Sequence, residues 1–216
     1  MKNTKLILGT FLAITAILFS SCGASSSSDS TSTENIGSQV WTSKNLDVAT
    51  YRNGDVIPQV QDADAWSNLR TGAWCYYDND ASNGTKYGKL YNWYAVNDAR
   101  GLAPKGFHIP SDAEWTILTD YLGGGAASAG EKMKSSTGWY ANGNGTNSSG
   151  FAGFPGGWRD YDGTFSSVGS NGYWWSATED NSNDAWSRDL DCSDGDVYRS
   201  SYHDKRNAFS VRCLGD

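Results

Sequence analysis

The stretch Gly106-Phe-His-Ile-Pro-Ser-Asp-Ala-Glu-Trp115 carries the clearest structural signal in the chain, which is the start of a helix. Ser111 and Glu114 form a capping box, in which each side chain accepts a hydrogen bond from the other residue's backbone amide. The apolar residues that follow recur on one helix face, at Trp115, Leu118 and Leu122. The glycine run that begins at Gly123 ends the pattern. The sequence therefore predicts a helix between Ser111 and Gly123.

A second main helix is predicted upstream, over residues 87–99. Its large side chains follow the i, i+3, i+4, i+7 spacing of one helix face, at Leu90, Trp93, Tyr94 and Asn97. Gly101 follows it and ends the pattern. Shorter helices are predicted over residues 62–69 and 127–134.

The last third of the chain predicts strands rather than helices. From Trp139 onward it is rich in Gly, Asn and Ser, and short β-prone runs cover residues 173–177, 185–190, 197–200 and 209–214. Earlier in the chain, the pair Asn53-Gly54 lies between β-prone flanks and predicts a hairpin. The expected fold class is therefore α+β, with two main helices flanking a small irregular antiparallel sheet with long loops.

The N-terminus predicts export and a lipid anchor. Lys2 and Lys5 precede an apolar run, residues 6–19, that is shorter than the roughly 18–20 residues of a membrane-spanning helix. The sequence Leu18-Phe19-Ser20-Ser21-Cys22 then resembles a bacterial lipobox, in which Cys22 is lipidated after the leader is removed. An ordinary secretory signal and a single anchor helix are the alternatives. We expect a signal peptide at 1–21, a flexible Ser/Thr-rich tether at 22–37 and one domain at 38–216.

Composition narrows the expected partners. The chain has 216 residues and a formal charge of −7, and no run of Lys or Arg follows the leader. Nucleic acid is therefore not an expected partner, because phosphate neutralisation requires clustered cations. The 10 Trp, 12 Tyr and 25 Gly residues predict a core built from a few large rings. Tyr and Trp also supply rigid contact area at low entropic cost, which is typical of binding surfaces.

Six motifs occur in the order found in a known family, and they span most of the chain after Trp41. Together they resemble the Fibrobacter succinogenes major paralogous domain (FISUMP) family. The motifs are Trp74-Cys-Tyr-Tyr-Asp-Asn-Asp80, Tyr87-Gly-Lys-Leu-Tyr-Asn-Trp93, Gly106-Phe-His-Ile-Pro-Ser-Asp-Ala-Glu-Trp115, Phe154-Pro-Gly-Gly157, Gly172-Tyr-Trp-Trp-Ser-Ala-Thr-Glu179 and Ser210-Val-Arg-Cys213. The resemblance implies a lipid-anchored or secreted bacterial protein with a C-type-lectin-like fold, whose N- and C-terminal strands lie close together. It implies no particular biochemical activity.

Three cysteines remain beyond Cys22, so an oxidising compartment would favour one disulfide and one free thiol. The residues alone leave the pairing open. The resemblance favours Cys75 with Cys213, because both lie in shared motifs, and Cys192 with Cys213 is the alternative. The motif around Ser111 is also similar to one in formylglycine-generating enzymes. The close pair of reactive cysteines that those enzymes use is missing, so that activity is not expected.

The segment 185–206 is similar to the variable binding surface of C-type-lectin-like proteins that are diversified by retroelements. If Leu190 faces inward with Trp186 and Arg188, the alternate residues of the strand point to solvent. The predicted ligand-binding residues are Ser187, Asp189, Asp191, Ser193, Ser200, Tyr202 and His203. We expect a surface-tethered, non-catalytic binding module for a glycan or protein ligand. The alternatives are a structural cell-envelope protein without a discrete ligand and an enzyme that acts on polysaccharide.

A metal or cofactor is not required by any motif. Asp78, Asp80 and Ser82 alternate as oxygen ligands of a Ca²⁺ loop would, but the EF-hand pattern fails at Asn83 and Lys89. The other interpretation is a turn in which these side chains bond nearby backbone amides. We therefore expect no catalytic residues and no cofactor, with Ca²⁺ at this loop as the one alternative.

Overall fold

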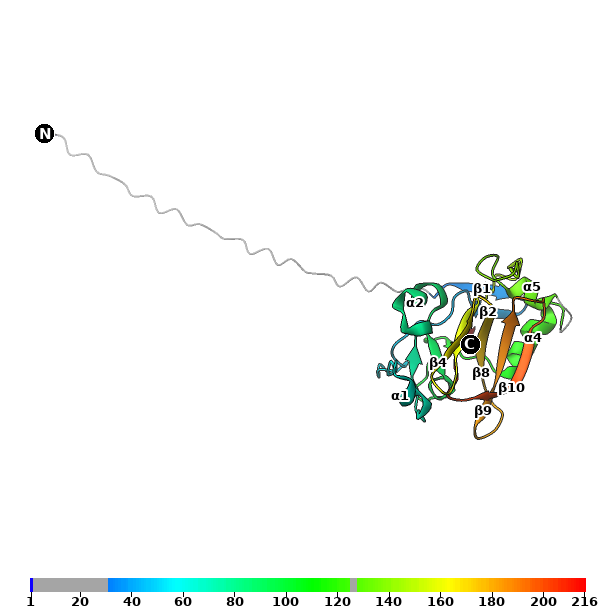
Figure 1. Cartoon of the computed structure of the whole chain (residues 1–216). Coiled ribbons are helices and arrows are strands. Elements are labelled where there is room, and N and C mark those ends of the chain that lie inside the picture. The colour runs from blue at the N-terminus through cyan, green and yellow to red at the C-terminus, as the bar shows by residue number, and fades with distance from the viewer. Residues whose placement is uncertain (2–30, 125–127) are drawn as a thin grey trace. The chain divides into compact units, whose positions relative to one another are not determined.

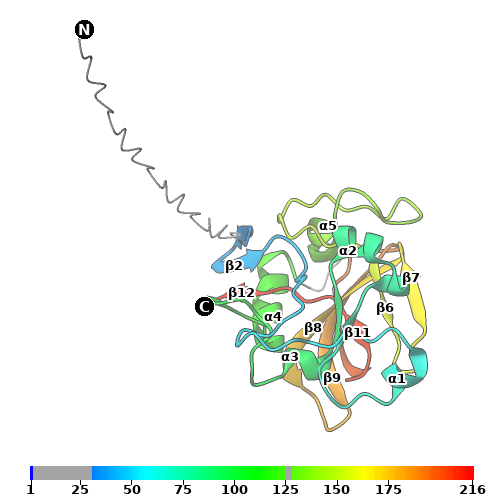
Figure 2. The same cartoon turned by 90° about the vertical axis from the view of Figure 1, so that its left-hand side faces the viewer.

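A computed structural model describes Met1, residues 31–124 and residues 128–216. In these ranges the chain forms twelve strands in two sheets, together with five short α-helices and one 3-10 helix. The smaller sheet has the strand order β1-β2-β12-β5, so the first and last strands of the domain share it (Figure 2). Its strands are β1 (Thr33–Ile36), β2 (Gln39–Thr42), β5 (Phe107–His108) and β12 (Leu214–Gly215).

The larger sheet has eight strands in the order β10-β9-β8-β6-β11-β4-β3, with β7 paired to β6. Its long strands β8, β9 and β10 lie side by side and antiparallel, and α4 lies next to them (Figure 1). The strands are β3 (Trp74–Cys75), β4 (Leu90–Asn92), β6 (Gly156–Arg159), β7 (Phe165–Val168), β8 (Asn171–Glu179), β9 (Asp184–Asp191), β10 (Tyr198–Asp204) and β11 (Ala208–Phe209).

The helices are short and lie between the strands in sequence. They are α1 (Ala63–Ser67), the 3-10 helix η1 (Tyr77–Asn79), α2 (Ala81–Tyr87), α3 (Trp93–Val96), α4 (Asp112–Tyr121) and α5 (Ala129–Met133). The predicted fold class is therefore wrong, because the described chain is mostly β-structure and not two main helices around a small sheet. The sheet is large, and only α4 has the length of an ordinary helix.

The helix predicted from the capping box is confirmed as α4. Ser111 Oγ accepts from the Glu114 amide at 3.3 Å, and Glu114 Oε2 accepts from the Ser111 amide at 2.7 Å. The helix predicted over residues 87–99 is wrong. Gly88, at a φ of 75°, ends α2, and residues 90–92 are all buried in β4 between β3 and β11. Only α3 remains helical, and the Asn92 side chain caps it by accepting from the Ala95 amide.

Two aromatic-rich cores lie on opposite sides of β8. Trp174 and Trp175 are neighbours in sequence, so their side chains project from opposite faces of the strand. Trp174 packs in a cluster with Trp41 and Trp115, whereas Trp175 packs in another cluster with Phe209. Both tryptophans are fully buried. The unusual Trp and Tyr content is thus used largely to fill two cores from one sheet.

The predicted disulfide is wrong, because Cys75, Cys192 and Cys213 are all free thiols. Cys75 lies on β3 in a cluster with Trp66 and Leu90, whereas Cys213 lies beside β12 in the cluster around Phe209. The two residues thus lie in different parts of the core. The alternative pair, Cys192 with Cys213, is absent as well.

The free thiols can be counted in solution. Burial raises the pKa of both Cys75 and Cys213 to about 12. The thiolate is the reactive form, so a thiol reagent should modify half-buried Cys192 quickly and the other two cysteines only after unfolding. Peptide mapping under non-reducing conditions should find all three as thiols. Recovery of a Cys75–Cys213 peptide from the native protein would contradict the structure.

The predicted lipidation site, Cys22, and the predicted signal peptide lie outside the described residues. β1 lies within the end of the predicted tether, residues 22–37. Within the described ranges, no helix combines the length and apolar character that crossing a bilayer requires.

Candidate functional site

One side of the large sheet carries a group of rings that we call the aromatic face. It consists of Trp158 on β6, Tyr173 on β8, and Tyr202 and His203 on β10, where an irregularity between Ser200 and His203 interrupts the strand's alternation. Tyr173 pairs directly with Asp189, and Asp189 pairs with Tyr198 on the next strand. Directly paired residues project from the same side of a sheet, so three strands bring their rings and carboxylates together there.

The rings of the aromatic face pack around Phe209, which is fully buried. Phe209 stacks on Tyr173 with centroids 5.0 Å apart and an interplanar angle of 24°. Trp158 and His203 lie 5.6 and 5.8 Å from the Tyr173 ring, measured between centroids. The ring of Tyr202 lies 5.0 Å from His203 and is 75% exposed. The face therefore runs from a buried floor to an exposed edge, with half-buried rings between them.

Polar groups with spare hydrogen-bonding capacity lie beside these rings. Asp189 is only 9% exposed, and Ser200 Oγ, at 3.5 Å from its Oδ1, is the one side-chain donor found for it in the described residues. Ser187 Oγ is completely buried and has no hydrogen-bond partner among those residues. A buried carboxylate normally accepts several hydrogen bonds, so the Asp189 carboxylate has unused acceptor capacity.

The electrostatics of the aromatic face follow from burial. Burial raises the pKa of Asp189 to about 7, with a further contribution from the carboxylates of Asp191 and Asp194. Burial also lowers the pKa of His203 to about 4, and the nearby Asp184 only partly offsets this. At neutral pH the imidazole is therefore uncharged and Asp189 is partly protonated. Burial, with a further contribution from the carboxylates of Asp189 and Asp191, raises the pKa of the Tyr173 hydroxyl.

The predicted orientation of β9 is correct for one face and wrong for the other. Leu190 and Arg188 are buried, as expected. Ser187 and Asp189 were expected to face solvent but are buried too, because side chains of the paired residues on β8 and β10 flank them on that face. Ser200, on β10, is also buried.

The remaining predicted residues lie in two places. Asp191 ends β9 and Ser193 lies in the turn that follows, where the Ser193 amide and hydroxyl donate to Asp191 Oδ1 at 2.7 and 2.6 Å. Asn171 also donates to Asp191, so this carboxylate is largely occupied with holding the turn. Tyr202 and His203 belong to the aromatic face, although His203 is more buried than the sequence predicted.

The opposite side of the same strands is occupied by α4. Buried Arg188 donates to Asp112 Oδ1 at 2.7 Å, and Arg199 donates to Asp112 Oδ2 at 2.7 Å. The Arg199 guanidinium also lies 3.8 Å from the centroid of the Trp186 ring. This side is thus tied to the helix start, which leaves the aromatic face as the free side of β9 and β10.

The loop considered for Ca²⁺ serves another purpose. Asp80 is the N-cap of α2, and its Oδ1 accepts from the Ser82 amide at 2.8 Å. Asp78 lies inside the 3-10 helix at a φ of 52°. Among the described residues, no three Asp, Glu, His or Cys side chains converge in a way that could hold a metal ion.

A family model, described as the Fibrobacter succinogenes major domain, matches residues 35–214. The chain belongs to this family. The match to the Fibrobacter succinogenes major domain covers both sheets, from β1 to β12, and it includes every residue of the aromatic face. A search of curated proteins and a search of solved structures each found no match.

Sequence reasoning missed two residues of the aromatic face, Trp158 and Tyr173. Trp158 follows the Phe154-Pro-Gly-Gly157 motif, and Tyr173 begins the aromatic run of β8. Both motifs were recognised, but β6 and β8 meet through the parallel pair Gly157–Gly172, which no local pattern reveals. The alternation within β8 could have placed Tyr173 on the same face as Trp175.

Proposed function

We propose that the protein is a non-catalytic binding module that recognises a glycan through the aromatic face. The observation that carries this proposal is the buried Asp189 carboxylate, with unused acceptor capacity, beside the half-buried rings of Trp158 and Tyr173. Sugars present C–H faces that pack on aromatic rings and hydroxyls that donate to carboxylates. A site with rigid rings and few oriented polar groups is typical of small-ligand recognition.

The exposed edge of the face suits contact with a chain of sugars. Tyr202 is mostly solvent-exposed, and Tyr198 is exposed on the same strand with its hydroxyl donating to Asp194 Oδ2 at 2.6 Å. Rings of this kind can pack against successive sugars without ordering a long flexible side chain. A protein partner would use the same rings as anchors, so it is the main alternative occupant of this surface.

The N-terminal sequence supports a location for this binding. A lipid on Cys22 would hold the domain at the bacterial envelope, on the outer membrane or cell surface, and the Ser-rich tether would keep it away from the membrane. The proposal is thus a tethered module that retains a glycan near the cell. A structural envelope protein would bind no discrete ligand, and a polysaccharide-acting enzyme would convert the glycan that it binds.

Glycan-array screening of the purified protein, followed by calorimetry on the best ligand, tests the proposal. Tyr202→Ala and Trp158→Ala should each weaken affinity by about tenfold or more, because buried or central rings are frequent hot spots. Tyr121→Ala is the matched control, since this tyrosine is 64% exposed on α4 and should change affinity by less than about twofold.

Three outcomes would count against the proposal. One is a glycan whose affinity is the same for the parent, Trp158→Ala and Tyr202→Ala proteins. Another is an array without any bound glycan together with a protein ligand that requires Tyr202. The third is hydrolysis of the bound glycan that Asp189→Asn abolishes, which would show an enzyme instead.

A further inference from the structure

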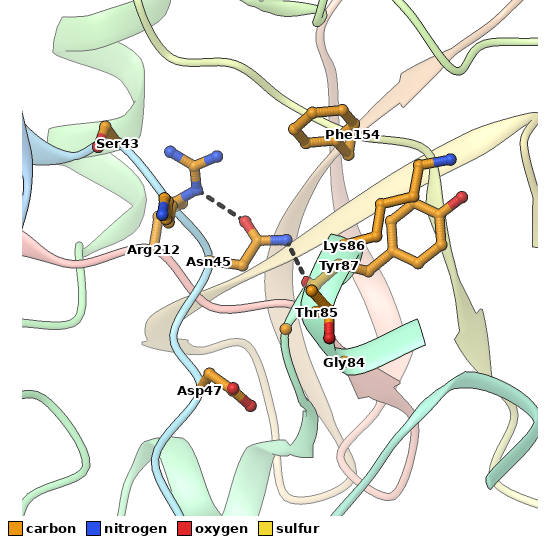
Figure 3. A pocket seen from close by; sticks show the side chains of 11 residues that line it. Ser43, Asn45, Asp47, Gly84, Thr85, Lys86, Tyr87, Phe154 and Arg212 are labelled. Atoms are coloured by element: carbon orange, nitrogen blue, oxygen red, sulfur yellow. Dashed lines mark hydrogen bonds between the residues drawn. The ribbon is translucent and has the colours of Figure 1, made fainter. Parts of the chain in front are cut away.

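A cavity of about 490 Å³ lies away from the aromatic face, among four stretches of chain that are distant in sequence. Its walls come from residues 43–47 after β2, from the end of α2, and from Phe154 and Arg212 (Figure 3). The volume is within the usual range of small-molecule pockets. None of its lining residues belongs to the aromatic face, so it is a separate candidate site.

The lining of this cavity is cationic in a chain that is acidic overall. Lys44, Lys86 and Arg212 line it, and Asp47 is the only carboxylate among the lining residues identified. Asp47 Oδ1 is already paired with Lys89 Nζ at 2.6 Å. The full chain has a formal charge of −7, so this local excess of positive charge is opposite to the overall balance.

Arg212 is the unusual member of this group. It is 1% exposed, and its described partners are neutral oxygens: Asn45 Oδ1 at 2.7 Å, the Thr42 carbonyl at 2.7 Å and the Ala152 carbonyl at 3.1 Å. These bonds use three of its five N–H groups. Buried Arg188, in contrast, has the Asp112 carboxylate as its partner. A buried cation without an anion is costly, and an anionic ligand in the cavity would offset that cost.

Asn45 fixes the guanidinium at the cavity wall. Its amide nitrogen donates to the Tyr87 carbonyl at 2.8 Å and to Ser210 Oγ at 3.1 Å. Its Oδ1 accepts from both Arg212 Nε and Trp174 Nε1. Figure 3 shows Asn45 between Arg212 and the end of α2, with Lys86, Tyr87 and Phe154 along one side of the pocket.

The end of α2 is held close to this wall by Gly88. A Cβ at this position would lie 2.9 Å from the Leu46 carbonyl oxygen and 3.1 Å from Asn45 Cβ, and its φ of 75° also favours glycine. This part of the cavity wall is therefore formed by closely packed backbone. Such preorganisation reduces the entropic cost of binding.

We propose that this cavity is a second binding site, which takes a monosaccharide unit bearing a carboxylate. Arg212 and the two lysines would hold the carboxylate, and Asn45, Ser43 and Thr85 would face the hydroxyls. The half-buried ring of Phe154 would pack on the sugar face. A bare inorganic oxyanion would fill only part of a cavity of this size.

Titration of the purified protein with D-glucuronate, D-glucose, inorganic sulfate and inorganic phosphate tests the proposal. Glucuronate should bind. Its affinity should fall as NaCl rises from 50 to 500 mM, because salt screens the attraction between the carboxylate and the cationic side chains. Glucose should bind at least about tenfold more weakly, because it lacks the charge-assisted hydrogen bonds. If glucose binds as tightly as glucuronate, the site does not recognise a carboxylate. If sulfate or phosphate binds as tightly as glucuronate, the site does not recognise a sugar. Either result would overturn the proposal.

Exposed lysines provide variants that should fold normally. Lys44→Gln and Lys86→Gln should each weaken glucuronate binding by about two- to fivefold, the range of exposed ion pairs. Lys105→Gln, which removes an exposed lysine outside the cavity, is the matched control and should have no effect. If Lys44→Gln and Lys86→Gln behave like Lys105→Gln, the proposal is wrong.

A near-isosteric change at Asn45 introduces a side-chain carboxylate that competes with the ligand for Arg212. Asn45→Asp places a carboxylate on Arg212 and should weaken glucuronate binding by about tenfold or more. Trp158→Ala removes a ring of the aromatic face and should leave glucuronate affinity unchanged. Loss of glucuronate binding in Trp158→Ala would show that the ligand occupies the aromatic face and would overturn the cavity assignment, so the two sites can fail independently.

Discussion

Replacing Trp174 with alanine should lower the free energy of unfolding by about 3–5 kcal/mol, the usual cost of truncating a buried aromatic residue. Trp174 is fully buried on β8, and its ring packs edge-on against Phe151 with centroids 5.5 Å apart. Truncation removes these contacts and leaves a cavity between β8 and the segments around it. It also leaves Asn45 Oδ1 without the bond from Trp174 Nε1, which is 2.9 Å long.

The backbone around Trp174 is shaped to its ring, so the cavity should not collapse easily. A Cβ on Gly172 would lie 2.6 Å from the ring, and one on Gly153 would lie 3.1 Å from it. Both glycines therefore allow main chain to pack directly on the indole. Main chain held in strands and loops relaxes less than a side chain does, which favours the upper part of the expected range.

Urea denaturation of Trp174→Ala and Trp186→Ala makes a matched comparison. Trp186 is half-buried on β9 and lies on the same side of the sheet, where its main described contact is the Arg199 guanidinium. Its truncation should cost about 1 kcal/mol, the size of an exposed cation–π contact with modest burial. Equal losses in the two variants would show that the Trp174 ring is not a central part of the core.

The capping box shows which parts of the fold the sequence could predict. Ser111, Glu114 and the apolar face after them determine α4 by contacts within a few residues, so its start could be predicted. The structure of residues 87–99 could not be predicted in this way, because the residues with helical spacing lie partly in a strand and partly in a single helical turn. In β4 each residue is buried between neighbouring strands, and that tertiary burial outweighs the local pattern.

The candidate site was predictable only in part, for a similar reason. The alternation of β9 placed Leu190 inward, but it could not show that side chains of β8 and β10 would flank Ser187 and Asp189 on the other side. Tyr202 could be predicted because it lies in the segment 185–206, which resembles a variable binding surface. Tyr173 lies opposite Asp189 through the register of the β8–β9 pair, and Trp158 joins them through the parallel pairing of β6 with β8. Local sequence patterns do not determine either register. The cationic cavity likewise joins Asn45 to Arg212, which are 167 positions apart.

Asp189 and His203 should give opposite pH slopes to the free energy of unfolding, and single substitutions should reveal them. Burial, together with Asp191 and Asp194, raises the pKa of Asp189 from 3.8 to about 7 despite the Ser200 hydrogen bond. Burial lowers the pKa of His203 from 6.5 to about 4, and Asp184 opposes this shift. Each residue therefore binds its proton over a different range in the folded and unfolded states.

The signs follow from proton binding in the two states. Between pH 3.8 and 7 the folded state holds a proton on Asp189 that the unfolded state has released. Stability then falls by about 1.4 kcal/mol per pH unit as pH rises. Between pH 4 and 6.5 the unfolded state holds a proton on His203 that the folded state lacks. Stability there rises with pH at the same slope of about 1.4 kcal/mol per unit, so the two contributions nearly cancel in the parent.

Urea denaturation at half-unit steps from pH 4 to 8 separates the two residues, because other groups give a background common to all variants. Relative to the parent, Asp189→Asn should gain stability as pH rises, by roughly 4 kcal/mol between pH 4 and 7. His203→Gln should lose stability relative to the parent, by roughly 3 kcal/mol between pH 4 and 6.5. The two differences have opposite signs, which a general loss of packing would not produce. Difference curves that are flat with pH would mean that Asp189 is ionised and His203 protonatable in the folded protein, as at an open surface.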